Sequence, residues 1–337
     1  MRARWPQRVI FSLLPLVVVL GSAELGLRAA GWPPPGGHFD HNSPYWVLDP
    51  DQRLAVVPHP EEQSSFLLST DHHGLRAPLH DGPKASGSTR IMALGCSTTL
   101  GWGVNDDQSY PARLEALGRA QGLPLEVVNG GQPGYTTFQG LWLWDTVLSS
   151  YQPDIVLIGY VVQDARRSAY TDRSQAVLSQ DHRFLKDHLL WQSRVYLGLR
   201  ALLGAVQVRA KERPTGSAPD DTSGVYRVPP DEYRANLRAL IAGVRAIGAR
   251  PVLFGYPLEV EGYTTAHRAV LAELSQSEDV PYLDLQPMMS AAAAERTLYF
   301  PQDRGHANAE GNALIAESAL GWLEQSGFLP AAAPPAR

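Results

Sequence analysis

The stretch RIMALGCSTTLGWGV, residues 90–104, decides how this chain folds. It starts as an apolar run that ends at Gly95, and small or hydroxylated residues follow at once, beginning with Cys96 and Ser97. Such a run is typical of a buried strand, and residues this small are typical of a tight turn behind it. Two interpretations follow: an ordinary turn that needs small side chains, or a turn that presents a nucleophile.

Outward from this stretch, strand patterns alternate with helix patterns. The segment DIVLIGYVV (154–162) is an almost continuous apolar run, as expected for a strand buried on both faces of a parallel sheet. Shorter apolar runs predict further strands at 125–130, 250–256 and 281–285. Amphipathic stretches predict helices at 110–122, 136–151, 229–248, 264–277 and 308–327. This alternation predicts an α/β fold: an open parallel sheet covered by helices on both sides.

Composition excludes several classes of protein. The net charge of -5 over 337 residues is mild, and no basic surplus indicates a nucleic-acid partner. The chain has a single cysteine, which excludes an intrachain disulfide and argues against a thiolate zinc site. We therefore expect neither nucleic acid nor a metal among its partners.

The N-terminus, residues 1–31, has the pattern of a signal anchor or signal peptide. Arg2, Arg4 and Arg8 precede an apolar run from Val9 to Ala23. By the positive-inside rule the arginines stay in the cytoplasm and the rest of the chain is exported. We expect a membrane-anchored, extracytoplasmic domain, either periplasmic or at the cell surface, with secretion after signal cleavage as the alternative.

Beyond residue 31, the same patterns divide the chain into a linker, a main domain that contains an insertion, and a tail. Residues 32–89 predict a linker with an irregular lead-in, because 32–60 are rich in Pro, Gly, His and Asn and DGPKASGST (81–89) has the composition of a loop. Residues 90–327 contain the alternating strands and helices and predict the main folded domain. Within it, residues 166–225 break the alternation and predict a helical insertion, either a lid over the site or an extra packing helix. Residues 328–337 predict a disordered tail.

Ligands of open parallel sheets bind beyond the carboxyl ends of the strands, so candidate site residues should follow strands. Ser97 follows the first strand, Gly134 lies in the glycine-rich segment after the second, and Gln163 follows the third. Each has an ordinary explanation as a turn or cap. A serine hydroxyl at such a turn would also be exposed above the sheet edge, with backbone and amide N–H groups around it.

A fourth segment, PQDRGHANAEGNALIAE (301–317), precedes the last helix. Asp303 stands three residues before His306, and Gly305 between them permits a sharp turn. A carboxylate so placed can bind Nδ1 of the imidazole and leave Nε2 to take a proton from a serine. Alone, the pair is more often a helix cap beside a surface histidine. Together, the four segments supply a nucleophile, a base, an orienting acid and an oxyanion hole.

In these four blocks the chain resembles the SGNH (GDSL-type) hydrolases. The resemblance covers roughly residues 90–327 and implies a flavodoxin-like three-layer α/β/α fold with a parallel sheet. It implies a Ser97–His306–Asp303 triad and an oxyanion hole formed by Ser97, Gly134 and Gln163. It further implies hydrolysis of a carboxylic ester, as by an esterase or deacetylase, with no cofactor.

Two positions depart from the family pattern. Cys96 stands where the family usually has aspartate, and Gln163 stands where it has asparagine. The longer Gln163 side chain must fold back to reach an oxyanion, and losing one such donor costs about 10²–10³ in rate. An O-acyltransferase acting on an envelope glycan, or a non-catalytic glycan-binding or scaffold protein, stay open as alternatives. The expected substrate bears an ester, with an O-acylated glycan or a lipid as candidates.

Overall fold

The computed structural model describes residues 5–32, 45–58, 65–80, 82–180, 190, 193–199, 202, 224–260 and 262–330. The chain divides into two compact units, which are described separately below. One unit comprises residues 1–43 and 176–218, and the other comprises residues 44–175 and 219–337.

The larger unit is built on a five-stranded parallel sheet, which confirms the predicted fold class. The strand order is β4-β3-β5-β8-β9, so the first of these strands in sequence lies between the second and the third. This is the flavodoxin-like order, and its switch point lies between β3 and β5. The strands are β3 (Thr89–Gly95), β4 (Leu125–Gly131), β5 (Ile155–Ile158), β8 (Arg250–Gly255) and β9 (Tyr282–Asp284).

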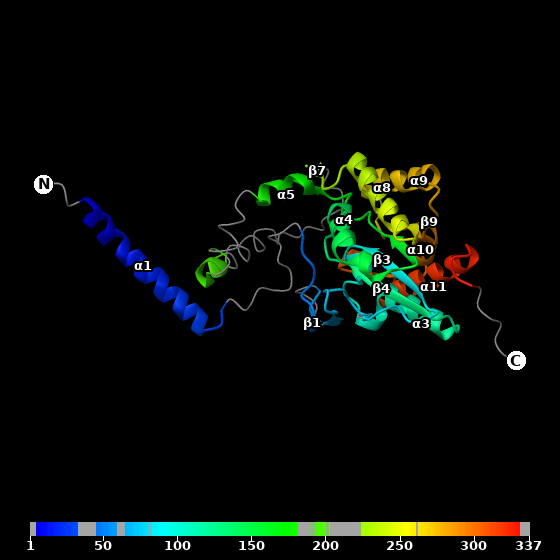
Figure 1. Cartoon of the computed structure of the whole chain (residues 1–337), viewed down its shortest axis with the longest axis horizontal. Helices are drawn as coiled ribbons and strands as arrows, with labels where there is room; N and C mark the ends of the chain where they lie inside the picture. Colours follow the sequence, from blue (N-terminus) through cyan, green and yellow to red (C-terminus); the bar gives the residue numbers. More distant parts are fainter. Residues whose placement is uncertain are drawn as a thin grey trace. The chain divides into compact units, whose positions relative to one another are not determined.

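Helices cover both faces of this sheet, as Figure 1 shows. The helices α4, α8 and α9 pack together as one layer, and α3 and α11 pack together as the other. The helices of this unit are α2 (Ser97–Leu100), α3 (Tyr110–Ala120), α4 (Thr137–Thr146), α8 (Pro230–Ala246), α9 (Thr265–Ser277), α10 (Gln286–Ala293) and α11 (Ala309–Gln325). The short 3-10 helices are η1 (Asp106–Gln108), η2 (Leu148–Tyr151) and η4 (Gly262–Thr264). Helix α5 (Asp172–Gln180) runs across the boundary between the two units.

The central strands have apolar side chains on both faces because both faces are covered. In β3, residues 91–94 are completely buried, and all of β5 is completely buried. Burying one such side chain stabilises the fold by about 1.5–3 kcal/mol. The strand expected at 154–162 is shorter, since only Ile155–Ile158 pairs with its neighbours. The residues behind it are therefore available to form the loop that carries Gln163.

Residues 45–58 and 65–80 are more regular than the sequence suggested. Strands β1 (Arg53–Val56) and β2 (Phe66–Ser69) form an antiparallel pair inside the segment expected to be irregular. Both are only four residues long, too short for their alternation to stand out in the sequence. Two further small sheets pair β6 (Arg167–Ser168) with β7 (Val225–Tyr226), and β10 (Tyr299–Phe300) with β11 (Asp303–Ala307).

The smaller unit contains α1 (Trp5–Ala29) and described residues of the segment 176–218. In it the Glu24 carboxylate accepts hydrogen bonds from the backbone N–H groups of Arg194 and Val195, at 2.9 and 3.0 Å. Within the part of the chain that the structure describes, no helix is long and apolar enough to cross a membrane. Much of the predicted insertion at 166–225 lies outside the described residues, so its helical character stays a prediction.

The chain end is packed as far as Leu329. The ring of Phe328 stacks on that of Trp322, and Leu329 is 4 % exposed. Residues 331–337, most of the predicted disordered tail, lie outside the described residues.

Candidate functional site

Ser97 lies directly behind the central strand β3, where the sequence predicted a turn. It is the first residue of α2 and is 7 % exposed. The turn is tightly packed against the sheet: a Cβ at Gly95 would lie 2.0 Å from Oγ1 of Thr99, and one at Gly131 would lie 2.3 Å from the backbone nitrogen of Leu100. Only glycine fits at these two strand ends. The glycines therefore let the turn with Ser97 lie close above the sheet.

The structure brings Ser97 together with His306 and Asp303. Nε2 of His306 lies 2.8 Å from Oγ of Ser97, and Nδ1 of the same ring lies 2.5 Å from Oδ2 of Asp303. The aspartate and the histidine belong to β11, an element that the sequence did not predict. The backbone N–H of Gly305 donates to Oδ1 of Asp303 at 3.2 Å, which fixes the second carboxylate oxygen. The three side chains form one continuous hydrogen-bonded chain.

Gly134 and Gln163 lie behind β4 and β5, the two neighbours of β3 in the sheet. Gly134 has a φ of 72°, a left-handed conformation that favours glycine. Nη1 of Arg227 donates both to the carbonyl oxygen of Gly134, at 2.8 Å, and to Oε1 of Gln163, at 3.0 Å. One guanidinium nitrogen thus bonds to two of the three residues that the resemblance predicted as oxyanion donors. Sequence reasoning did not identify Arg227, because it lies just past the divergent segment 166–225.

Cys96 is a buried neighbour of Ser97 rather than an exposed thiol. It is 1 % exposed, and Sγ lies 3.2 Å from Oγ1 of Thr98. Burial raises the pKa of the Cys96 thiol, so the reactive thiolate is disfavoured. A small, buried side chain at this position agrees with the interpretation that Cys96 supports the turn.

Arg76 holds the loop behind Ser97 in place through hydrogen bonds, and the sequence did not predict this role either. Its side chain is completely buried. Nη1 donates to the carbonyl oxygens of Leu100 and Gly101, at 2.8 and 2.6 Å, and Nη2 donates to that of Val104, at 2.5 Å. Nε donates to Oδ1 of Asp106 at 3.1 Å. An arginine whose partners are backbone carbonyls leaves no pattern in the sequence, because those carbonyls come together only in the fold.

Asp164, the residue after Gln163, is a buried acid. Its Oδ1 accepts hydrogen bonds from the backbone N–H and the hydroxyl of Thr137, at 2.8 and 2.6 Å. Its Oδ2 has no hydrogen-bond partner among the described residues. Burial, only partly offset by the Thr137 hydrogen bonds, raises the pKa of Asp164 to about 7. A substantial fraction of this carboxyl is therefore neutral near neutral pH.

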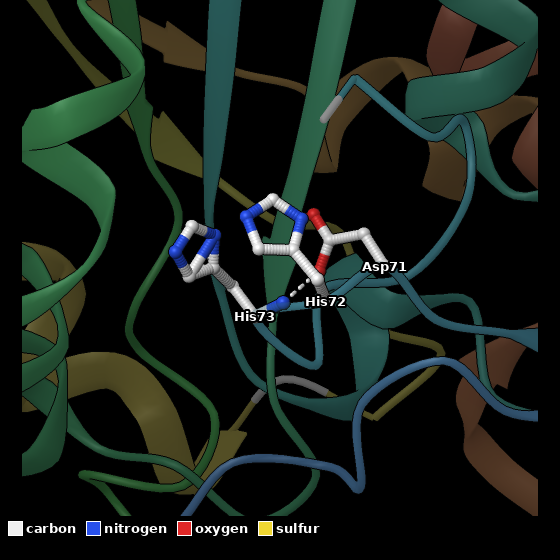
Figure 2. Close-up of side chains that lie close together, drawn as sticks. All are labelled: Asp71, His72 and His73. Atoms are coloured by element: carbon white, nitrogen blue, oxygen red, sulfur yellow. Dashed lines mark hydrogen bonds between the residues drawn. The ribbon is translucent and has the colours of Figure 1, made fainter. Parts of the chain in front are cut away.

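A cluster of potential metal ligands, Asp71, His72 and His73, lies at a turn behind β2 (Figure 2). Their ligand atoms lie within 4.8 Å of one another. The Asp71 carboxylate already accepts hydrogen bonds from the backbone N–H groups of His73 and Leu75, at 2.9 and 2.8 Å, and from the hydroxyl of Tyr151, at 2.6 Å. The same hydroxyl lies 3.0 Å from Nδ1 of His73. These hydrogen bonds give the cluster a structural role, because they join the turn at residues 71–75 to Tyr151 in η2.

The region holding the predicted site residues matches one protein family. Residues 93–314 match the model of the GDSL-like lipase/acylhydrolase family, and this range includes Ser97, Gly134, Gln163, Asp303 and His306. The chain belongs to the GDSL-like lipase/acylhydrolase family. Membership of this family makes it a serine hydrolase of the SGNH type that acts on ester bonds, as the resemblance in its four sequence blocks predicted.

Solved structures similar to this GDSL-like hydrolase include esterases. A lipolytic protein of the G-D-S-L family from Desulfitobacterium hafniense is 17% identical with a TM-score of 0.45, covering 69% of this chain and 99% of the other. The psychrotrophic esterase EstA from Pseudoalteromonas sp. is 16% identical with a TM-score of 0.47, covering 72% and 100%. The acetyl xylan esterase AlAXEase is 13% identical with a TM-score of 0.48, covering 69% and 99%. Among curated proteins, none matches this sequence.

Proposed function

We propose that this protein hydrolyses a carboxylic ester through Ser97, His306 and Asp303. The observation that carries the proposal is the hydrogen-bonded chain from Oγ of Ser97 through both nitrogens of His306 to Asp303, with distances of 2.8 and 2.5 Å. Asp303 accepts the Nδ1–H of the ring, so Nε2 is left as the acceptor for the serine proton. This tautomer is the one that general-base catalysis needs.

The reaction runs in two steps. Oγ of Ser97 attacks the ester carbonyl carbon while its proton passes to Nε2 of His306, and the C–O bond to the alcohol then breaks as the imidazolium returns that proton to the leaving oxygen. Water next attacks the acyl-serine, gives its proton to His306, and releases the acid as Ser97 recovers its proton. Asp303 stabilises the imidazolium in both steps.

The oxyanion of each tetrahedral intermediate is bound by the N–H groups of Ser97 and Gly134 and by the side-chain amide of Gln163. Support comes from their positions behind three adjacent strands, on both sides of the sheet's switch point. The left-handed backbone at Gly134 fits a loop whose N–H groups turn toward one point. Preorganised donors of this kind contribute roughly 3–4 kcal/mol each to the transition state.

Kinetics of a minimal ester, p-nitrophenyl acetate, test the catalytic assignment. Ser97→Ala and His306→Ala should each lower kcat by about 10⁴-fold or more, and Asp303→Asn should lower it by about 10⁴-fold because Asn favours the wrong histidine tautomer. Gln163→Ala should lower kcat by about 10²-fold. Ser97→Ala turning over the ester at the wild-type rate would refute the assignment.

We also propose that residues 1–31 export this domain and hold it at the outer side of a membrane. The support is the order of the sequence, with Arg2, Arg4 and Arg8 before the apolar run from Val9 to Ala23. At that location an O-acylated envelope glycan or a lipid ester is the substrate class within reach. If a sugar hydroxyl replaces water in the second step, the same site transfers the acyl group.

Fractionation of cells that express the full chain tests this location. The protein should sediment with membranes and be digested by protease added outside the cytoplasmic membrane. Replacing Arg2, Arg4 and Arg8 by Glu should reduce export. Recovery of the unmodified chain in the cytoplasmic fraction, protected from protease, would contradict the proposal. Incubating the exported enzyme with an O-acetylated glycan should release acetate, and a tagged acceptor sugar would reveal transfer.

A further inference from the structure

The amide of Gln163 has its orientation set by Arg227. Nη1 of Arg227 donates to Oε1 of Gln163 at 3.0 Å. A guanidinium has only donors, so the atom of the amide facing it must be the oxygen. The NH₂ group of Gln163 therefore faces away from Arg227, and a rotation of the amide by 180° would bring donor against donor.

Arg227 is itself held rigidly. Its Nε and Nη2 donate to the two carboxylate oxygens of Asp172, both at 2.9 Å, in a bidentate pair. Asp172 is 4 % exposed and accepts a further hydrogen bond from the hydroxyl of Thr136 at 2.7 Å. The remaining bond of Nη1, to the carbonyl oxygen of Gly134, ties the same guanidinium to the second predicted oxyanion loop.

The backbone around Arg227 is equally constrained. Its N–H donates to the carbonyl of Arg166 and its carbonyl accepts from the N–H of Asp172, both at 2.8 Å. The next residue, Val228, accepts a hydrogen bond from Nε2 of the buried His267 at 2.8 Å. Burial lowers the pKa of His267, which keeps this ring neutral with its proton on the nitrogen that donates. Hydrogen bonds therefore hold both the backbone of Arg227 and all three nitrogens of its guanidinium group.

We propose that Arg227 is a positioning residue that presents the Gln163 amide N–H to the oxyanion. Glutamine has one more rotatable bond than the asparagine usual at this position, and the hydrogen bond from Arg227 restricts that added freedom. The same contact fixes which end of the amide faces the substrate. The inference rests on the proposed function, since it presupposes an oxyanion formed at Ser97.

A double-mutant cycle between Arg227 and Gln163 tests this inference. With p-nitrophenyl acetate, Gln163→Ala should lower kcat by about 10²-fold and Arg227→Met by at least about tenfold, with KM little changed. In the Gln163→Ala background, Arg227→Met should lower kcat by less than about threefold, because the donor that it orients is gone. Equal factors in both backgrounds would overturn the inference, since a general loosening of the site acts regardless of Gln163.

Two further variants keep the test informative if Arg227→Met unfolds. Arg227→Lys retains the positive charge beside Asp172 but not the planar fork, so it should keep its thermal stability and lose kcat. Gln163→Glu keeps an acceptor for Arg227 and replaces the NH₂ donor with a carboxylate oxygen, so kcat should fall at least as far as in Gln163→Ala. A Gln163→Glu enzyme with wild-type kcat would overturn the inference.

The matched control is Arg173→Ala. Arg173 is next to Asp172 in sequence, is largely exposed, and pairs with Glu232 at 2.8 Å. Its removal should leave kcat unchanged in both backgrounds. Failure of the proposed nucleophile is distinguishable: an active Ser97→Ala enzyme refutes it. An inactive Ser97→Ala together with a fully active Gln163→Glu leaves Ser97 as the nucleophile and refutes Gln163 as an oxyanion donor and, with it, the role of Arg227. An inactive Ser97→Ala with equal effects of Arg227→Met in both Gln163 backgrounds refutes only the role of Arg227.

Discussion

Two arginines, Arg76 and Arg227, hold the two sides of the candidate site in different ways. Arg76 is completely buried and donates to three carbonyls of the loop that follows Ser97 and to the carbonyl of Leu67 in β2. Arg227 is 20% exposed and connects the loops behind β4 and β5 to Asp172. Arg76 is therefore part of the buried core and should matter mainly for stability. Arg227 is partly exposed and contacts Gly134 and Gln163, so it should matter mainly for the orientation of these two residues.

The largest effect is expected from Arg76→Met. The substitution leaves several buried carbonyl oxygens and the Asp106 carboxylate without their donor, and should lower the free energy of unfolding by about 4 kcal/mol. Urea unfolding followed by circular dichroism measures this loss. Arg227→Met, measured alongside, should lose clearly less. If the two losses are equal, the distinction between the two arginines is wrong.

Asp164, on the Arg227 side, should make stability depend on pH. Its ordinary pKa of 3.8 is raised to about 7 in the folded protein, so between these pH values the folded state holds a proton that the unfolded chain has lost. Its contribution is therefore fully present below about pH 4 and falls by about 1.4 kcal/mol per pH unit until about pH 7. Asp164→Asn cannot ionise, so its stability relative to the wild type should improve by roughly 3 kcal/mol between pH 5 and pH 8. Urea titrations at the two pH values measure the difference, and a constant difference would contradict a raised pKa.

Two glycines, one on each side of the candidate site, should differ in how much a substitution by alanine costs. Gly101 and Gly134 both have left-handed backbones, with φ of 83° and 72°. A Cβ at Gly101 would lie 2.7 Å from Cβ of Ser109 and 3.2 Å from Nη1 of Arg76, whereas one at Gly134 would meet no atom of the described residues within 4 Å. Gly134→Ala should cost only the backbone strain, about 1 kcal/mol, and Gly101→Ala about 2 kcal/mol or more. Thermal unfolding of the two variants ranks them, and the reverse order would contradict the packing described for Arg76.

The smallest effect is expected from Arg173→Ala, on the solvent side of Asp172. This arginine is 63% exposed and pairs with one carboxylate, so removing it should leave the unfolding temperature and kcat within experimental error. A marked loss of activity would mean that the whole surface around Asp172 is needed, and the specific role given to Arg227 would be weakened.

The fold was predictable because its signals are local. The apolar runs at 90–95 and 154–162 and the glycines at the strand ends are visible in the sequence, and the strand-end rule then places Ser97, Gly134 and Gln163 at one sheet edge. The close approach of Asp303 and His306 also followed from their spacing. The short strand β11 that carries them did not, because its five residues, DRGHA, have no strand pattern.

The roles of Arg76, Arg227 and Asp164 could not be predicted from the sequence, because each role depends on tertiary contacts. Arg76 and Arg227 each bond to carbonyls from distant segments, and nothing in the sequence says which segments meet. The raised pKa of Asp164 likewise depends on burial by neighbours remote in sequence. The sequence did single out Gln163 as a departure from the family pattern, and in the structure this is the residue that Arg227 contacts.

Peptide mapping after reaction with a fluorophosphonate tests the central claim, that Ser97 is the nucleophile, most directly. The reagent forms a stable phosphonyl ester with an activated serine, and mass spectrometry locates it. The protein should carry one adduct, on Ser97, and Cys96→Ala should carry it as well because that thiol is buried. Ser97→Ala should remain unlabelled. An adduct on another residue, or an enzyme that hydrolyses esters without labelling at Ser97, would contradict the claim.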